Sequence, residues 1–275
     1  MRLSVVIPVH NEAENIASLL AEIDRALGIL PHEIIFVDDA STDDTLLRLR
    51  EALQGYPNLR VIRHGEKCGQ STAILTGVEH ARAPWIVTLD GDGQNDPADI
   101  PVLYAMVRES HGKGRPVTCV CGYRRTRHDS PLRRLSSQIA NTVRRRLLGD
   151  DTPDSGCGIK IFSRHAFLRL PYFDHMHRFL PALFQRAGGT VVAAEVNHRP
   201  RLHGRSKYGL HNRLWVGIID ICGVMWLQRR TKLPEVIEEH SSYERKKYLD
   251  DSRVCRTTPF HHAFCRAVAA KRADA

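Results

Sequence analysis

Three carboxylates and two carboxamides follow one apolar stretch of this sequence. The run "WIVTL" leads directly into "DGDGQNDP", which contains Asp90, Asp92, Gln94 and Asp96. Because Asp90 and Asp92 are two residues apart, their side chains point the same way in an extended segment, and Gln94 continues that face. Carboxylate and amide oxygens are the ligands that Mg²⁺ and Mn²⁺ prefer. The spacing therefore predicts a Mg²⁺ or Mn²⁺ site at the first three of these side chains, whereas Asp96 is better placed to cap the helix that follows.

Basic side chains dominate a second stretch. Residues 122–146 hold eight arginines and a single acid. An arginine can make two parallel hydrogen bonds to phosphate oxygens, so Arg124 and Arg133 are expected to bind phosphate. The arginines at 144–146 read instead as a solvated helix face. A later basic loop, "HGRSKYG" at 203–209, has a glycine near each end and cations between them, as a mobile loop that closes over a ligand needs.

Short runs rich in Val and Ile, such as "LSVVIPV" and "EIIFVDD", indicate strands buried on both faces of a parallel sheet. Strands are expected at 3–9, 33–39, 59–63, 85–89, 116–122 and 190–196. Helices are expected at 16–27, 46–53, 69–81, 130–148, 163–170, 174–188, 211–229 and after Pro97. Asn11 with Glu14 is expected to cap the first helix. The alternation predicts an α/β fold, in which ligands bind at the carboxyl ends of the strands, where Asp39 also lies.

The 275-residue chain has a net charge of +9, and the charge is unevenly distributed. Residues 1–100 carry 8 basic and 16 acidic side chains, a balance of −8, and the remaining residues have a balance of +17. The first part suits cation binding, and the second suits phosphates or an anionic surface. Mixed charge and weak periodicity indicate a loosely ordered tail at 231–275.

The sequence carries few signs of export or membrane insertion. The apolar stretch 214–227 contains Asp220 and is shorter than the roughly 20 residues that span a bilayer, so no transmembrane helix is expected. No signal peptide is expected either, because the N-terminus lacks a cationic start followed by a long apolar run. The seven cysteines are expected to be free thiols in a reducing compartment, which indicates the cytoplasm.

Several stretches resemble known glycosyltransferases in both order and spacing. "SVVIPVHNEAENI", "IIFVDDASTDDT", "CGQSTAILTGV" and "IVTLDGDGQNDPADIP" resemble the nucleotide-binding half of family-two glycosyltransferases with the GT-A fold. "GYRRTRHDSPLRRLSSQIAN", "DSGCGIKIF", "HRFLPAL" and "HRPRLHGRSKYG" are similar to the polyprenyl-phosphate glycosyltransferases, the group that contains dolichol-phosphate mannosyltransferase. The resemblance covers about 1–230. It implies a Rossmann-like, mostly parallel sheet with helices on both faces and a helical C-terminal appendage, divided into a nucleotide-sugar half at 1–122 and an acceptor half at 123–230.

The resemblance also implies roles for individual residues. The base and ribose pocket of the donor would be formed by Pro8, Val9, Asn11, Glu12 and Asp39. The metal that bridges the donor diphosphate would be held by Asp90, Asp92 and Gln94. The donor diphosphate and the lipid phosphate would be met by Arg124, Arg133, Ser137, Arg201, Ser206 and Lys207. Asp154 lies where the family places an acidic residue near the sugar, and it could bind sugar hydroxyls, orient an arginine or cap a turn. Those expected to take part in catalysis are Asp92, Arg124, Arg133 and Asp154.

The implied reaction transfers a sugar from a nucleotide-diphosphate donor to a polyprenyl-phosphate lipid. Because that acceptor is already an anion, the enzyme must mainly align the reactants and neutralise the leaving diphosphate. Single displacement with inversion is expected, with mannose from GDP-mannose as the favoured donor. Helix 211–229 either packs on the sheet or lies in the membrane interface, where the neighbouring "RRTK" would engage anionic headgroups. A peripheral enzyme on the inner face of the cytoplasmic membrane is therefore expected.

Two other hypotheses fit parts of the sequence. An enzyme of the same fold could use UDP-glucose or another UDP-sugar, or act on a saccharide acceptor in cell-envelope glycan synthesis, but a hydroxyl acceptor needs a general base. A non-enzymatic protein could bind nucleic acid through the arginine-rich segment, with steep salt dependence. That hypothesis leaves the acidic strand ends unexplained, so no nucleic-acid partner is expected.

Overall fold

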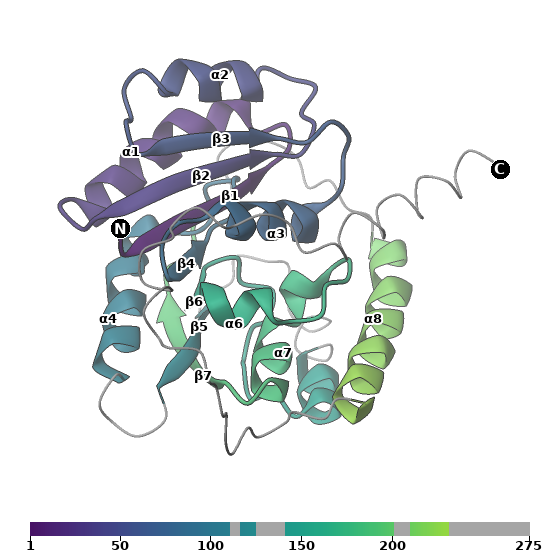
Figure 1. Cartoon of the computed structure of the whole chain (residues 1–275). Helices are drawn as coiled ribbons and strands as arrows, with labels where there is room; N and C mark the ends of the chain where they lie inside the picture. The colour runs from purple at the N-terminus through teal and green to yellow at the C-terminus, as the bar shows by residue number, and fades with distance from the viewer. Residues whose placement is uncertain (111–115, 125–140, 201–209, 231–275) are drawn as a thin grey trace, which may run out of the picture. The chain divides into compact units, whose positions relative to one another are not determined.

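A computed structural model describes residues 1–110, 116–124, 141–200 and 210–230, and these fall within one compact unit, Met1–Lys232. The unit is built on a seven-stranded sheet with the order β3-β2-β1-β4-β6-β5-β7 (Figure 1). The strands are β1 Leu3–Val9, β2 His32–Asp38, β3 Leu59–Arg63, β4 Trp85–Thr88, β5 Val117–Arg124, β6 Lys160–Ser163 and β7 Thr190–Val196. The predicted mostly parallel α/β sheet is confirmed.

Among the strands that the structure describes, only β6 runs antiparallel to the others. β1 pairs in parallel with β2 and β4, β2 with β3, and β5 with β7, whereas β6 pairs antiparallel with both β4 and β5. Its first residue, Lys160, is opposite Thr88 on β4 and Cys121 on β5. The amino end of β6 therefore reaches the edge where the parallel strands end, and it brings the preceding loop, 154–159, to that edge.

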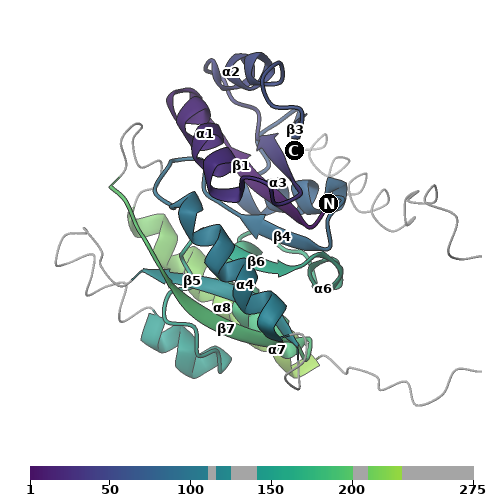
Figure 2. The same cartoon turned by 90° about the vertical axis from the view of Figure 1, so that its left-hand side faces the viewer.

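Helices cover both faces of the sheet (Figure 2). The helices are α1 Ile16–Leu27, α2 Thr45–Ala52, α3 Gln70–His80, α4 Ile100–Ser110, α6 Arg164–Leu168, α7 Leu180–Arg186 and α8 Leu210–Arg230. Residues of α1, α2 and α4 pack with Val5 and Ile7 of β1 in one core cluster, and residues of α3, α6, α7 and α8 pack with Val6 in the other. Because β1 is buried on both faces, it is almost entirely apolar, and its polar residue Ser4 donates a hydrogen bond to Glu33.

The structure differs from the expected elements at two places, and two further expected segments lie partly or wholly outside the described residues. β6 was not expected, because it has only four residues and begins with a lysine. The helix expected at 174–188 is a 3₁₀ turn, Met176–Arg178, followed by the shorter α7. Of the helix expected at 130–148, the structure describes the helical segment 141–148, and the expected tail at 231–275 lies outside the described residues.

The cap expected from Asn11 and Glu14 was also wrong. A 3₁₀ turn, Ala13–Asn15, precedes α1, and no side chain caps that helix. Asn11 has a φ of 56°, and its side chain accepts a hydrogen bond from the backbone N–H of Thr42 at 2.8 Å. The loop after β1 is therefore tied to the loop after β2 rather than to its own helix.

Helix α8 is half packed and half exposed. Val224 is fully buried in the second core cluster, and Ile221 and Met225 pack against that cluster. On the same helix Ile218, Ile219 and Trp226 are 44%, 68% and 59% exposed. Packing against the core thus holds for one side of the helix, and a membrane contact of the exposed side stays a prediction. None of the helices in the described part of the chain is long and apolar enough to cross a membrane.

Candidate functional site

The loop after β4 lies directly against the end of β1. A Cβ atom added at Gly91 would fall 2.6 Å from Cγ1 of Val9 and 3.2 Å from the carbonyl oxygen of Pro8. Only glycine permits that approach. The predicted meeting of strand ends therefore occurs, and it places Pro8 and Val9 beside the loop that carries Asp90 and Asp92.

Hydrogen bonds from three places shape the Asp90–Gln94 loop. Asp90 accepts a hydrogen bond from Nε2 of Gln70 at 2.9 Å, and its backbone N–H donates to Oδ1 of Asn95 at 3.0 Å. Asp92 Oδ1 accepts from the backbone N–H of Gln94 at 3.1 Å. The amide nitrogen of Gln94 is 3.5 Å from the carbonyl oxygen of Arg199. The loop is thus held by helix α3, by itself and by the chain after β7.

The charges around Asp90 fit a divalent cation. Burial and then the negative charge of Asp92 raise the pKa of Asp90 to about 6, although Lys160 and Arg124 oppose the shift. Two carboxylates that repel each other in this way gain most from a cation between them. Asp90, Asp92 and the amide oxygen of Gln94 are hard ligands, so this set fits Mg²⁺ or Mn²⁺.

Gly158 sets the space around Asp90. A Cβ atom at Gly158 would lie 2.1 Å from Oδ2 of Asp90 and 2.7 Å from Oδ1 of Asn95. The carbonyl oxygen of Gly158 accepts a hydrogen bond from Thr88 Oγ1 at 2.8 Å. The loop that precedes β6 therefore forms one wall of the acidic site.

Two cations face the acidic loop from β5 and β6. Arg124, at the end of β5, donates to both oxygens of Asp154, at 2.6 and 3.1 Å. Asp154 Oδ1 also accepts from the backbone N–H of Gly156 at 3.2 Å. Two of the roles expected for Asp154 are therefore seen in its contacts: it orients Arg124, and it holds the turn at Gly156. Lys160 is buried, donates to the carbonyl oxygen of Cys157, and is one of the charges that lower the pKa of Asp90.

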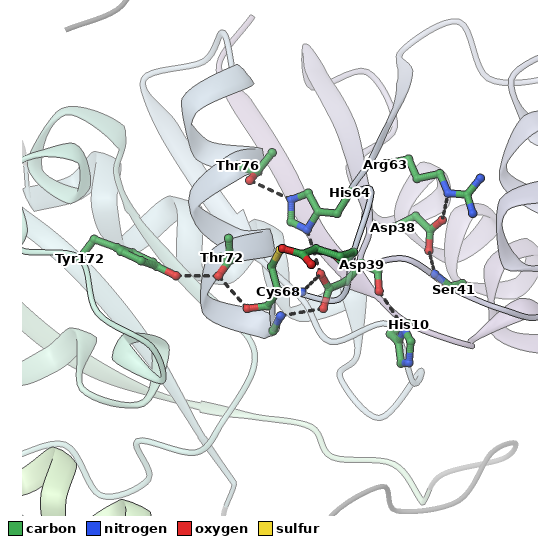
Figure 3. A network of polar contacts seen from close by, with 12 residues as sticks. His10, Asp38, Asp39, Ser41, Arg63, His64, Cys68, Thr72, Thr76 and Tyr172 are labelled. Atoms are coloured by element: carbon green, nitrogen blue, oxygen red, sulfur yellow. Dashed lines mark hydrogen bonds and ion pairs between the residues drawn. The ribbon is translucent and has the colours of Figure 1, made fainter. Parts of the chain in front are cut away.

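Asp39 lies at the end of β2 in a network of donors (Figure 3). Its oxygens accept from Nδ1 of His64 and from the backbone N–H groups of Cys68 and Gly69, each at 2.8 Å. Burial raises the pKa of Asp39, but these hydrogen bonds outweigh burial and leave it below its usual value. Asn11 and Glu12 approach the same loop through their backbone N–H groups, which donate to Ser41 and Thr45. The residues expected to form the nucleoside pocket are thus brought together.

The chain after β7 is bonded to the Asp90–Gln94 loop and to Asp96. The guanidinium of Arg199 pairs with Glu22 at 2.7 Å and with Asp96 at 2.6 Å, and its backbone N–H donates to the carbonyl oxygen of Gln94 at 3.0 Å. Asp96 also accepts from the backbone N–H of Ala98 at 3.0 Å, which confirms the expected cap. Asp96 therefore caps the turn at Pro97 and also pairs with Arg199, and the sequence predicted only the cap.

Five predicted residues lie outside the described part of the chain, namely Arg133, Ser137, Arg201, Ser206 and Lys207. The expectation for 144–146 was wrong at one position. Arg144 is buried and pairs with Asp150 at 2.5 Å, whereas Arg145 and Arg146 are exposed as expected.

The residues of the site that were not singled out from the sequence include Gln70, Gly158, Lys160 and His64. Lys160 left one signal, since a lysine inside the apolar run "IKIF" is unusual for a buried strand. Gln70 and His64 left none, because their partners are 20 and 25 residues away.

Comparison with known proteins identifies one family and several relatives of this chain. The model of the family described as glycosyl transferase family 2 matches residues 4–170. The dodecaprenyl-phosphate galacturonate synthase of Rhizobium johnstonii is 35% identical over 244 residues, which cover 85% of this chain and 69% of that protein. The undecaprenyl-phosphate 4-deoxy-4-formamido-L-arabinose transferase of Shewanella sediminis is 33% identical over 214 residues. These cover 76% of this chain and 62% of that protein, so the chain spans less than two thirds of the length of this relative.

Solved structures share the fold. A mannosyltransferase from Pyrobaculum calidifontis, solved with GDP-Man and Mn²⁺, has a TM-score of 0.57 and 21% identity, and the match covers 85% of this chain and 66% of that one. A glucosyl-3-phosphoglycerate synthase from Mycobacterium tuberculosis, solved with Mg²⁺ and UDP, has a TM-score of 0.61 and 18% identity, and the match covers 81% and 79%. At these identities the likeness establishes the GT-A fold.

Proposed function

Because the chain belongs to glycosyl transferase family 2, we propose that it transfers a sugar from a nucleoside-diphosphate donor to the phosphate of a polyprenol. One observation carries the proposal: a carboxylate pair, Asp90 and Asp92, lies opposite an arginine that Asp154 holds with two hydrogen bonds. The pair can hold a cation beside the donor diphosphate, and the arginine can bind phosphate oxygens. The polyprenyl-phosphate acceptor is supported by the names of both relatives.

The divalent metal would be held by Asp90, Asp92 and Gln94. When bound, Mg²⁺ or Mn²⁺ supplies Lewis-acid stabilisation of the charge on the leaving diphosphate. Gln70 and Gly158 keep the Asp90 carboxylate in place, and the backbone of Arg199 keeps Gln94 in place. These residues fix the metal ligands before the substrates arrive. Such preorganisation is usually the largest electrostatic contribution to catalysis.

Arg124 neutralises phosphate charge in this proposal, and Asp154 keeps its guanidinium in one orientation. Because both oxygens of Asp154 accept from Arg124, this carboxylate is poorly placed to remove a proton from a sugar hydroxyl. That favours an acceptor that is already an anion over a saccharide acceptor. The reaction is then a single displacement with inversion, in which this chain aligns the two substrates. Arg133, Ser137, Arg201, Ser206 and Lys207 would complete the phosphate-binding set.

The identity of the donor sugar can be decided directly by experiment. Mannose, favoured from the sequence, has no support from the two relatives, whose names give galacturonate and 4-deoxy-4-formamido-L-arabinose. GDP-mannose and the UDP-sugars therefore stand as alternatives for the donor. Asp39, with Pro8, Val9, Asn11 and Glu12, would discriminate the base.

The lipid acceptor requires a membrane surface. The exposed side of α8 presents Ile219 and Trp226 next to Arg229 and Arg230 at its end, a combination that suits apolar burial beside anionic headgroups. The enzyme would then work at the inner face of the cytoplasmic membrane, with α8 in the interface.

The first experiment is calorimetric titration of GDP and UDP into the purified protein, with Mn²⁺ and with a chelator. Asp92→Ala should abolish the metal-dependent binding, whereas Asp24→Ala, which removes an exposed carboxylate on α1, should leave it unchanged. Binding of one nucleotide selects the donor class, and radiolabelled transfer to undecaprenyl phosphate then tests the acceptor. If the folded protein binds neither nucleotide, the proposal is wrong.

A further inference from the structure

Three side chains with different ligand atoms converge beside helix α3. One carboxylate oxygen of Asp39, one ring nitrogen of His64 and the Sγ atom of Cys68 all lie within 4.8 Å of one another (Figure 3). Asp39 is buried, His64 is half-buried and Cys68 is exposed, so the cluster opens to solvent on the thiol side. None of the three belongs to the Asp90–Gln94 loop.

The donor set of this cluster selects a different kind of metal from the acidic loop. A thiolate and an imidazole favour borderline-soft cations such as Zn²⁺, whereas Mg²⁺ and Mn²⁺ prefer oxygen alone. Bonds of about 2.0–2.3 Å hold the ligand atoms of one zinc ion within roughly 4 Å of one another. The 4.8 Å limit exceeds that value by less than about 1 Å, and the exposed Cys68 side chain would rotate to close the difference.

The surrounding hydrogen bonds orient two of the three ligands in advance. The backbone N–H groups of Cys68 and Gly69 donate to the two oxygens of Asp39, and they fix the plane of its carboxylate. Nε2 of His64 is 3.0 Å from Oγ1 of Thr76 on helix α3. A metal-bound histidine characteristically donates its other ring N–H to such a partner, which sets the tautomer and the ring orientation.

We propose that Asp39, His64 and Cys68 form a second metal site, one for Zn²⁺ or a similar borderline-soft cation, distinct from the Asp90–Asp92 site. On binding, the Cys68 thiol releases its proton to solvent, and neutral His64 changes tautomer: it loses the Nδ1 proton that Asp39 accepts in the metal-free protein and takes up a proton on Nε2, where Thr76 accepts it. The carboxylate and the thiolate balance the two charges of the ion. Three protein ligands leave a fourth position for water or another ligand.

The site has a consequence for the donor, which rests on the proposed function. If Asp39 contacts the nucleoside, an ion bound to Asp39 competes with the nucleotide. Zn²⁺ then inhibits by a route that Mg²⁺ and Mn²⁺ do not use. The thiol that this inhibition requires belongs to Cys68, which directly precedes Gly69, the N-cap of α3.

Cobalt titration tests the site without any need for activity. Co²⁺ replaces Zn²⁺ in such sites, and a cobalt–thiolate bond produces a strong near-ultraviolet absorption band that oxygen ligands do not produce. The band should form in the wild-type protein and should be lost or strongly reduced in Cys68→Ser. Thr76→Val should weaken Zn²⁺ binding roughly tenfold, as the loss of a partner to a ligand does.

Two variants serve as controls for the assignment. Cys222→Ser removes another exposed thiol, on α8, and should keep the band. Asp92→Ala removes the acidic site and should also keep it. A wild-type protein without the band, or a band equally strong in folded Cys68→Ser, would overturn the proposal.

Nucleotide competition separates this proposal from the proposed function. Zn²⁺ should weaken the binding of the preferred nucleotide in the wild-type protein at least severalfold more than in Cys68→Ser. If neither nucleotide binds, the proposed function fails, while the cobalt band still decides whether the metal site exists.

Discussion

The Cβ position of Gly158 falls 2.1 Å from Oδ2 of Asp90, although the two residues are 68 positions apart in the sequence. The carboxylate therefore occupies the space that any other residue at 158 would need. Asp90 cannot move aside freely, because Gln70 and Asn95 both bind it. The acidic loop after β4 and the loop before β6 thus define the geometry of the candidate site together.

Gly158→Ala should displace the Asp90 carboxylate and weaken metal-dependent nucleotide binding. Overpacking of this kind costs about 1–3 kcal/mol of folding free energy, so the variant should still fold. Gly156→Ala is the matched control, since its Cβ would lie 3.5 Å from Asp154 and 3.6 Å from Arg124, at ordinary contact distance. Calorimetry of Mn²⁺ and nucleotide binding compares the two. Equal binding by both alanine variants would contradict the assigned role of Gly158.

Asp154→Asn should lower the rate of sugar transfer by roughly 100-fold, comparable to the loss of one preorganised charge-stabilising group. The substitution keeps the size of the side chain but removes the charge that holds the guanidinium of Arg124. Arg124→Lys should act similarly, because an ammonium cannot replace the two-point contact. Steady-state transfer rates at saturating donor provide the measurement, with exposed Arg145→Lys as the control. A normal rate for Asp154→Asn would exclude the positioning role.

Metal binding should depend on pH through Asp90, whose pKa is raised to about 6. The metal binds the ionised carboxylate, so protons compete with it below that value. The apparent Mn²⁺ affinity should fall by up to about tenfold for each pH unit below 6 and should level off above about pH 7. Calorimetry in buffers of different ionisation enthalpy counts the released protons. A flat affinity from pH 5 to about 7 would show that Asp90 is ionised throughout.

Glu33 should make the stability of the protein sensitive to acid. Burial raises its pKa, but hydrogen bonds from Ser4, the Arg82 backbone and Arg60 outweigh burial and leave the pKa below its usual value. A depressed carboxylate pKa stabilises the fold above the unfolded-state value of 4.5, and that stabilisation is lost as pH falls below it.

Glu33→Gln should therefore lower the free energy of unfolding by about 3 kcal/mol at neutral pH, and by less in acid. Glu51→Gln breaks an exposed pair with Arg48 and should change it by less than about 1 kcal/mol. Urea denaturation at several pH values gives both numbers. A Glu33→Gln effect of the same size at every pH would assign the loss to packing instead of charge.

The exposed side of α8 should bind anionic membranes. The double variant Ile219→Ser, Trp226→Ser should reduce co-sedimentation with phosphatidylglycerol vesicles at low salt, because both side chains are more than half exposed in the protein. Val102→Ser is the control, since Val102 is also an exposed apolar residue, 58% accessible, but lies on α4. Similar sedimentation of the double variant and the wild-type protein would remove α8 from the membrane contact.

The sequence by itself determined the parallel part of the sheet and the spacing of the predicted metal ligands. A strand buried on both faces is mostly apolar, so β1 and β2 can be recognised from their apolar runs "VVIPV" and "IIFV". Asp90 and Asp92 follow such a run at a spacing that the backbone translates directly into a shared direction. In both cases, neighbours along the chain carry the information.

Only the tertiary structure decided what surrounds those ligands. Antiparallel β6 inserts between β4 and β5, and this pairing brings Lys160 and Gly158 to the edge where Asp90 lies. Gln70 and His64 likewise find their partners only after α3 packs on the sheet. Local spacing cannot reveal such contacts, because strand order and register are set by the burial of the whole core.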